Sequence, residues 1–176
     1  YSWWFRRVAH NMNMFDVIRI DHFRAFAGYW EVPARHKTAE KGKWVKGPGA
    51  DFFEKLFKRF VDCHLIVEDL GEITDDVVEL VRRFDLAGMN ILQYALDGDP
   101  KHGSHRVYNH CRNSVVYTGT HDNNTIKGWF LKDISQSHRQ GVYDYFGRRI
   151  PVSNLHWEMI RMAFDSPSQL AVIPMQ

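Results

Sequence analysis

The sequence has few cysteines and no long hydrophobic run. Its 176 residues include only two cysteines, Cys63 and Cys111, and these form no CxxC motif. Two cysteines without a pairing pattern are typical of reduced thiols, so we expect a cytoplasmic protein. No apolar run approaches the ~18 residues that a membrane span requires. The sequence therefore points away from disulfide-rich secreted proteins and from membrane-spanning proteins.

The chain also lacks an excess of charge of either sign. Its formal net charge is +2, and its lysines and arginines are scattered along the sequence. A nucleic-acid-binding surface would need basic residues gathered in a stripe or patch, so we expect no nucleic-acid partner. Apolar residues make up 44% of the chain and aromatic residues 14%, which indicates a globular protein.

Neither end of the chain resembles a natural terminus. The sequence opens directly on the aromatic cluster "YSWWF" and stops at Gln176, just after the apolar run "LAVIP". A length of 176 residues suits one domain or a piece of a larger one. We therefore expect a fragment of a longer protein.

Five short apolar runs predict strands, and helical patterns lie between them. The runs are rich in Val, Ile and Leu and do not alternate with polar residues, as expected for a parallel sheet covered on both faces. One of the helical patterns begins with Thr74 as its expected N-cap. The predicted strands cover residues 16–21, 64–70, 88–96, 114–120 and 170–175, and the predicted helices cover 1–15, 51–63, 74–84, 125–134 and 153–164.

Alternating strands and helices fit two architectures, a doubly wound sheet and a (β/α)8 barrel. No glycine-rich phosphate loop follows the first predicted strand, which argues against the doubly wound sheet. Three predicted strands end in acids, Asp21, Glu68 with Asp69, and Asp122, and barrel enzymes build their active sites at such strand ends. Because a complete barrel has ~250 residues, we expect an α/β fold that is part of a TIM barrel, with residues 1–176 a fragment of its catalytic domain.

Two long segments without strand or helix patterns are predicted to be loops. The first, residues 29–49, is basic and contains Trp30 and Trp44, and the second is 97–113. Loops of this length are usually functional or disordered. The histidines in the second segment fit no zinc-binding spacing, so we expect a surface loop and no metal site. Asp97 in "DGDP" could bind a sugar hydroxyl or simply form a turn.

The charged residues at the strand ends suggest a pair of catalytic carboxylates. Arg19 and Asp21 should point to the same face of their strand, so the guanidinium favours an ionised aspartate, which suits a nucleophile. The next predicted strand ends in Glu68 and Asp69. Neighbouring strands lie ~4.8 Å apart, close to the ~5–5.5 Å that separates the carboxylates of a retaining glycosidase. Spacing alone leaves either acid open as the proton donor.

The same acids have a purely structural interpretation, in which they cap helices or pair with arginines. Three of them together, one with an arginine two residues earlier, favour the catalytic interpretation. The third acid, Asp122 in "THDNN", could bind sugar hydroxyls.

Three ordered motifs carry a resemblance to a known family. They are "RIDHFR" (19–24), "VEDLG" (67–71) and "YTGTHDNNT" (117–125). Through these motifs the chain resembles the amylomaltases, or disproportionating enzymes, which are the 4-alpha-glucanotransferases of glycoside hydrolase family 77 in the alpha-amylase superfamily. The resemblance extends nearly end to end through "YWEVPA" (29–34), "GMNILQYAL" (88–96) and residues 156–176.

The resemblance assigns roles to the strand-end residues. It implies that Asp21 is the nucleophile, Glu68 the general acid/base and Asp122 the acid that stabilises the transition state. It also implies that Arg19 and His121 hold the nucleophile and the sugar in the donor site. The implied reaction moves a segment of an α-1,4-glucan, such as a maltooligosaccharide, from a donor chain to an acceptor chain with retention and without a cofactor.

Transfer exceeds hydrolysis only if loops exclude water and bind an acceptor sugar, and Trp44 in the 29–49 segment is our candidate for the acceptor wall. The family resemblance corresponds to the fourth to eighth barrel strands, so the remainder of the barrel is needed to complete the fold. We expect the fragment alone to be inactive.

Three positions depart from the family pattern without removing an expected catalytic group: Val67, Ala25 and Asn124. Two other functions remain open. One is a hydrolase of α-glucans, and the other is a non-catalytic glucan-binding module, which would have no reason to retain a nucleophile and an acid.

Overall fold

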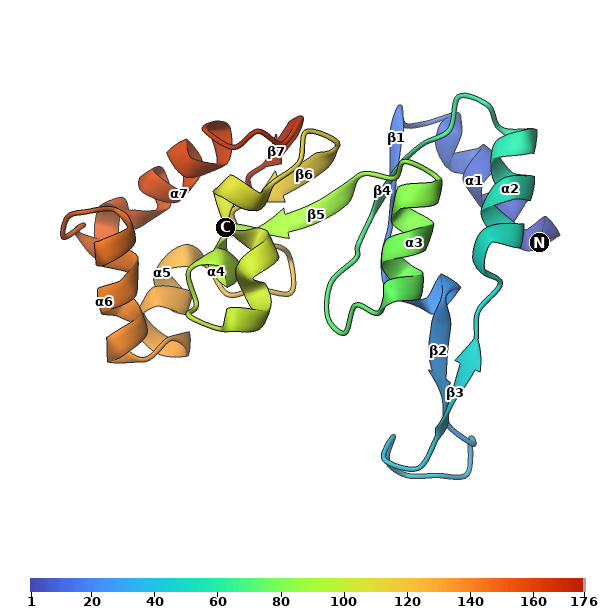
Figure 1. The fold of residues 1–176 in the computed structure, drawn as a ribbon, viewed down its shortest axis with the longest axis horizontal. Coiled ribbons are helices and arrows are strands. Elements are labelled where there is room, and N and C mark those ends of the chain that lie inside the picture. The colour runs from blue at the N-terminus through green and yellow to red at the C-terminus, as the bar shows by residue number, and fades with distance from the viewer. Residues whose placement is uncertain (176) are drawn as a thin grey trace. The chain divides into compact units, whose positions relative to one another are not determined.

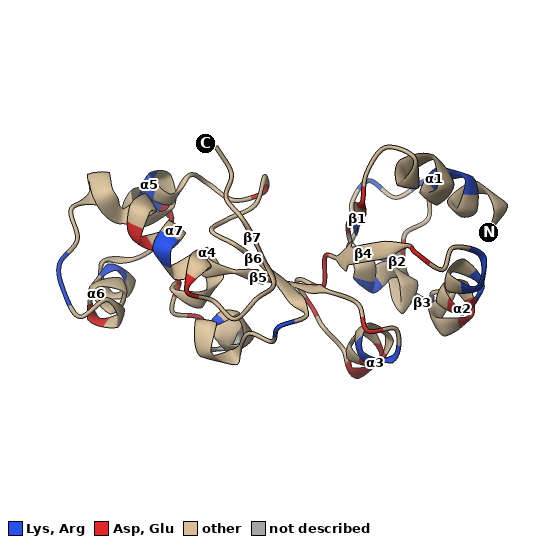
Figure 2. Cartoon of the chain, turned by 90° about the horizontal axis from the view of Figure 1, so that it is seen from above, with Lys and Arg blue, Asp and Glu red and all other residues tan. Residues whose placement is uncertain are grey.

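The computed structural model describes residues 1–175, apart from the side chains of residues 100 and 101. It divides into two compact units, Tyr1–Gly88 (unit 1) and Met89–Gln176 (unit 2). Gln176, the last residue of the segment 156–176, lies outside the described residues. Over residues 1–175, no helix combines the length and hydrophobicity needed to cross a membrane. Basic and acidic residues are interspersed along the elements of each unit (Figure 2).

Unit 1 contains three α-helices, one short 3₁₀ turn and two pairs of strands (Figure 1). Strands β1 and β4 pair in parallel, with Val17 opposite His64 and Ile20 opposite Val67. Backbone bonding continues past β4, because the Val67 N–H donates to the carbonyl of Ala87 at 2.9 Å. The elements are α1 (Ser2–Met12), β1 (Val17–Ile20), η1 (Phe23–Phe26), β2 (Gly28–Glu31), β3 (Lys43–Lys46), α2 (Gly49–Arg59), β4 (His64–Val67) and α3 (Asp75–Arg83).

The core of unit 1 is built largely from aromatic rings. Phe53 of α2 is fully buried, and its ring lies 5.5 Å from that of Phe23 and 5.0 Å from that of Phe26. Both partners lie in η1, the turn that follows β1 and Asp21. The apolar face of α2 therefore holds the segment after β1 in place.

Unit 2 contains a three-stranded sheet with the order β5-β6-β7, in which β6 and β7 are parallel. The central strand β6 is buried along its whole length, and the fully buried Val116 belongs to a core that includes Leu155 and Met159 of α7. The elements are β5 (Gly88–Ile91), α4 (Leu92–Ala95), η2 (Pro100–His105), η3 (Val107–Asn109), β6 (Ser114–Tyr117), α5 (Ile126–Gly128), η4 (Trp129–Asp133), α6 (Gln136–Tyr145), η5 (Val152–Asn154), α7 (Leu155–Phe164) and β7 (Leu170–Val172).

The five predicted strands and the five predicted helices are all present, but only β6 is buried on both faces as expected. Val17 of β1 is 41% exposed, and Leu170 of β7 is 45% exposed. Each of these strands pairs with a single neighbour in its sheet as described, so one edge and part of each face stay open. The prediction of complete burial was therefore confirmed only for β6, and it fails most clearly for β1 and β7.

The loop prediction for residues 29–49 was also wrong in part. Strands β2 and β3 form an antiparallel hairpin in which Trp30 is paired with Trp44, and the hairpin extends away from the helices of unit 1 (Figure 1). Cross-strand aromatic pairs of this kind stabilise hairpins. In the second predicted loop, 97–113, the chain forms the short turns η2 and η3.

Three further elements differ from the prediction. The apolar run 88–96 is a strand only as far as Ile91, after which the chain continues directly as α4. Helix α6 was not predicted, and the Ser135 side chain caps it by accepting from the N–H of His138 at 3.2 Å. Helix α7 begins at Leu155, two residues after the predicted start.

Thr74 precedes α3 as predicted, but it does not cap the helix with its own oxygen. Its hydroxyl donates to the Asp76 carboxylate, which accepts from the N–H of Val77 at 3.1 Å. An acid in the first turn thus satisfies one of the free N–H groups of the helix.

The aromatic core of unit 1 yields a stability prediction. We expect Phe53→Ala to lower the free energy of unfolding by about 3–5 kcal/mol, because it removes a fully buried ring and leaves a cavity. Val61→Ala, at a side chain that is 83% exposed, should change it by less than about 0.5 kcal/mol. Denaturant unfolding of the two variants measures the difference, and equal losses would contradict this view of the core.

Candidate active site

The pairing of β1 with β4 fixes where the first two predicted catalytic acids lie. The last paired residues are Ile20 and Val67, so Asp21 and Glu68 follow at equivalent positions of two parallel strands. The Glu68 N–H donates to the carbonyl of Ile20 at 2.8 Å, and the Phe23 N–H donates to the carbonyl of Glu68 at 3.0 Å. Because residues at the same position of parallel strands point to the same face, the two carboxylates share one side of the sheet.

Arg19 orients the Asp21 carboxylate. Its Nη2 donates to Oδ1 of Asp21 at 2.6 Å, as expected for residues that share a strand face. The Asp21 side chain is 65% exposed, so this ion pair adds little to stability. Its effect is instead to hold the carboxylate in one orientation at the end of β1.

Glu68 is half-buried, and its surroundings favour the protonated acid. Burial raises the pKa of the Glu68 carboxyl above its usual range, and the negative charge of Asp21 raises it further. The N–H groups of His22 and Leu70 donate to this carboxylate at 2.6 and 3.2 Å and limit the rise. A carboxyl that stays protonated to higher pH than usual is suited to donate a proton.

The carboxylates of Glu68 and its neighbour Asp69 have different surroundings in the structure. The sequence spacing could not show this difference. The Asp69 carboxylate lies against Gly88, in the space that a side chain at Gly88 would occupy. The Glu68 carboxylate is instead bound by the backbone of the segment that carries Asp21. Of the two acids, Glu68 is therefore the one that shares its surroundings with Asp21.

His22 has a backbone conformation that is uncommon for a residue with a side chain. Its φ of 50° and ψ of 48° lie in the left-handed region. This conformation turns the chain sharply after Asp21, and in the turned chain the His22 N–H donates to Glu68 Oε2. Left-handed backbone costs energy in residues other than glycine, and such strain is often found at functional sites.

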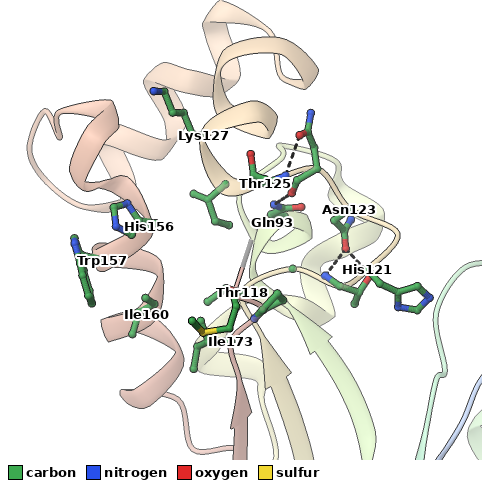
Figure 3. A pocket seen from close by; sticks show the side chains of 16 residues that line it. Gln93, Thr118, His121, Asn123, Thr125, Lys127, His156, Trp157, Ile160 and Ile173 are labelled. Atoms are coloured by element: carbon green, nitrogen blue, oxygen red, sulfur yellow. Dashed lines mark hydrogen bonds between the residues drawn. The ribbon is translucent and has the colours of Figure 1, made fainter.

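The third predicted acid, Asp122, lies in unit 2 beside His121. His121 Nε2 lies 3.4 Å from Asp122 Oδ2, and both side chains are more than 60% exposed. Asn123 shapes the turn, because its Oδ1 accepts from both the N–H and the hydroxyl of Thr120 at 2.8 Å (Figure 3). Asp122 and the Asp21–Glu68 pair belong to different units, so an approach of the three acids remains a prediction.

Gln93 supports the same turn and was missed at the sequence level. Its side chain is 1% exposed, and its Nε2 donates to the carbonyl of Asn124 at 2.8 Å (Figure 3). Gly119 packs against the Gln93 amide, leaving no room for a larger residue without a shift. The sequence signal that could have found it was a glutamine inside the apolar run 88–96. A buried side-chain amide usually has a defined hydrogen-bond partner, so a glutamine in such a run indicates a structural role.

A pocket of about 800 Å³ opens beside the turn that contains His121 (Figure 3). It has an apolar side formed by α7 and the residues after β7, and a polar side formed by the turn after β6. A mixed lining of this kind suits a polar organic ligand or a covering segment of protein. The lining residues are Gln93, Thr118, Gly119, Thr120, His121, Asn123, Asn124, Thr125, Ile126, Lys127, His156, Trp157, Ile160, Ile173, Pro174 and Met175.

The two remaining predicted sugar-binding residues both have protein partners. Asp97 accepts from the N–H of Asp99 at 2.9 Å and lies 2.7 Å from Nδ1 of His102, so its carboxylate stabilises a local turn. Trp44 is 54% exposed in β3, with its ring 5.5 Å from that of Trp30. No group of three metal-ligating side chains is found among the described residues, including the histidines of 101–111.

Comparison with known proteins places these motifs in context. Residues 1–176 match the family model described as 4-alpha-glucanotransferase. A 4-alpha-glucanotransferase of Aquifex aeolicus (strain VF5) is 41% identical over 177 residues, which cover 100% of this chain and 36% of the relative. The chloroplastic/amyloplastic 4-alpha-glucanotransferase of Solanum tuberosum is 42% identical over 176 residues, covering 100% of this chain and 30% of the relative.

A solved structure is similar along the same length. Amylomaltase from Streptococcus agalactiae in complex with acarbose matches with a TM-score of 0.91 and 29% identity, over 99% of this chain and 35% of that chain. The chain thus spans about a third of the length of the proteins it matches.

The left-handed conformation of His22 yields a prediction for the site. We expect His22→Val to lower the free energy of unfolding by about 1–2 kcal/mol, because β-branched residues tolerate this conformation poorly. His22→Asn removes the same imidazole but tolerates a positive φ, so it should lose less than half as much. Denaturant unfolding measures both. If the asparagine variant were destabilised as much as the valine variant, the loss would come from the side chain and not from the backbone.

Proposed function

This chain belongs to the 4-alpha-glucanotransferase family, and from that membership we propose that the protein transfers segments of α-1,4-glucan between maltooligosaccharide chains. The observation that carries the proposal is the paired ends of β1 and β4, where a carboxylate bound to arginine and a half-buried acid share one face of the sheet. The names of the relatives support the reaction. The acarbose bound to the matching amylomaltase supports a glucan-like ligand.

In the proposed mechanism, Asp21 attacks the anomeric carbon of the donor while Glu68 gives its proton to the departing glycosidic oxygen. The covalent glycosyl–Asp21 ester then reacts with a hydroxyl of the acceptor glucan, whose proton goes to the ionised Glu68. Two inversions at one carbon give net retention. Arg19 holds Asp21 for the attack, and Asp122 with His121 would stabilise the charge that develops on the sugar ring.

We include in this proposal that the chain forms the fourth to eighth strands of a (β/α)8 barrel. The parallel pairs β1–β4 and β6–β7 and the similarity to the amylomaltase support it. A barrel would bring the ends of these strands to one face, where Asp122 could join Asp21 and Glu68. The rest of the barrel would then be required for activity, so residues 1–176 alone should be inactive.

Trp44 and Asp97 keep narrower roles in the proposal. The exposed ring of Trp44 offers a surface on which an acceptor sugar can stack. Asp97 has a protein partner for its carboxylate and would act on the sugar only as part of the turn that it holds. A cytoplasmic location also belongs to the proposal and rests on the reduced thiols of Cys63 and Cys111.

Product analysis tests the reaction. The full-length protein that contains this chain should convert maltotriose into glucose plus oligosaccharides longer than maltotriose. Asp21→Asn should lower this conversion by about a thousandfold or more, since it removes the nucleophile, while glucan binding persists. Asp62→Asn, at an exposed acid outside the site, is the matched control and should transfer normally. Glucose and maltose as the only products would indicate the hydrolase, and binding without turnover would indicate the non-catalytic module.

The raised pKa of Glu68 gives a prediction for the pH dependence. Glu68 must be protonated at the start of the first step, so the rate falls as pH rises through its pKa. Because burial raises that pKa, the basic limb of kcat/KM should lie above the ordinary carboxyl value of 4.5. Initial rates of transfer between pH 4 and pH 9 measure the limb. A limb at or below 4.5 would contradict the role of burial.

Glu68→Gln provides the control for this assignment. The variant should lose about a hundredfold or more in transfer from maltotriose and should lose the basic limb. A maltosyl fluoride donor needs no proton for its leaving group to depart, so the variant should still release fluoride from it in the first turnover. Equal losses of the first-turnover rate with both donors would remove Glu68 from the role of proton donor.

A further inference from the structure

Arg24 is a buried cation that the proposed mechanism does not use. It lies in η1, three residues after Asp21, and the residue is only 9% exposed. Its Nη2 donates to the hydroxyl of Thr74 at a long 3.4 Å. Its Nε and Nη1 are buried without a hydrogen-bond partner among the described residues. Donors left in this way are costly, so a charge placed here needs another source of stabilisation.

The ring of Trp44 supplies part of that stabilisation, together with the nearby carboxylate of Asp76, whose charge interacts with Arg24. The guanidinium carbon of Arg24 lies 4.3 Å from the centroid of the indole, well within the range of a cation–π contact. Such contacts are strongest when the cation is removed from water, as it is here. A planar guanidinium stacks on a ring and stays charged when buried, which a lysine ammonium does less well.

The contact adds a side-chain attachment between two segments that the backbone already joins, because β2 follows η1 directly and the N–H of Gly47, just after β3, donates to the carbonyl of Ala27 at 2.8 Å. Arg24 belongs to the segment that holds Asp21 and His22, whereas Trp44 belongs to strand β3 of the hairpin that extends from the helices (Figure 1). The bond to Thr74 adds the start of α3 as a third attachment. The backbone bonds fix the base of the hairpin, and Arg24 holds the indole of Trp44 itself against the nucleophile segment.

We propose that Arg24 is a positioning residue that fixes the indole of Trp44, and with it the β2–β3 hairpin, relative to Asp21. The inference rests on the proposed function for its catalytic consequence, because Trp44 is the surface on which the acceptor sugar stacks. Losing the anchor should weaken acceptor binding and leave the attack of Asp21 on the donor largely intact. Water would then compete better for the glycosyl–enzyme intermediate.

Hydrogen exchange of the full-length protein tests the anchor without reference to activity. In Arg24→Leu, amides of residues 28–46 should exchange about tenfold faster, because the hairpin loses the side-chain contact that attaches it to η1. Arg24→Lys keeps a cation over the ring and should give a smaller increase. Arg7→Leu is the matched control, since Arg7 also lies over a tryptophan, Trp3, at 5.1 Å in helix α1. Unchanged exchange of the hairpin in both Arg24 variants would overturn the proposal.

Acceptor kinetics test the consequence. With glucose as acceptor, Arg24→Leu should raise the acceptor KM about tenfold and raise the ratio of hydrolysis to transfer, while formation of the glycosyl–enzyme changes less than about twofold. General damage to folding would instead reduce the active fraction, and an unchanged acceptor KM would overturn the proposed effect on Trp44.

The double variant of Arg24 and Trp44 separates positioning from a general loss of structure. If Arg24 acts through Trp44, adding Arg24→Leu to Trp44→Leu should raise the acceptor KM no further. Additive effects would overturn the coupling. If the wild-type protein showed no transfer at all, the proposed function would fall, while hydrogen exchange would still decide whether Arg24 anchors the hairpin.

Discussion

The parallel pairing of β1 with β4 is the constraint on which the candidate site depends. It sets Asp21 beside Glu68, and the backbone bonds around Glu68 extend that pairing past the last strand residue. A shift of one residue in either strand would turn one carboxylate to the opposite face. The register is itself held by burial, because Ile20 and Val67 are both packed into the core of unit 1. Packing and chemistry are therefore specified by the same few residues.

Two neighbouring carboxyl groups can perform different tasks only if their surroundings differ. Asp21 is mostly exposed and bound by a guanidinium, whereas Glu68 is half-buried and has a raised pKa. Each group also affects the other, because the charge on Asp21 helps to keep the proton on Glu68. This division between a carboxylate and a neighbouring acid is the pattern expected of a retaining glycosyl-transfer site.

Much of this arrangement could be predicted from the sequence, and the failures have physical causes. Runs of Val and Ile indicated the strands, and acids at their ends indicated the site. The hairpin of residues 28–46 was missed because each of its strands has only four residues and depends on a tryptophan pair. Helix α6 was missed because its sequence, "QSHRQGVYDY", has only a weak apolar face and depends on the cap at Ser135. The sequence could not show whether Glu68 or Asp69 shares its surroundings with Asp21, since this depends on the turn at His22 and on the space at Gly88.

The groups that hold the Glu68 carboxylate are main-chain N–H groups of His22 and Leu70. Every amino acid except proline provides such a donor, so a replacement leaves the bonds in place wherever it keeps the backbone shape, which at His22 is left-handed. Genetic drift can therefore alter the neighbouring side chains considerably before the acid loses its support. Drift cannot easily alter the shape of the backbone at these positions. Among related sequences, the backbone shape would therefore vary less than the identity of the neighbouring side chains.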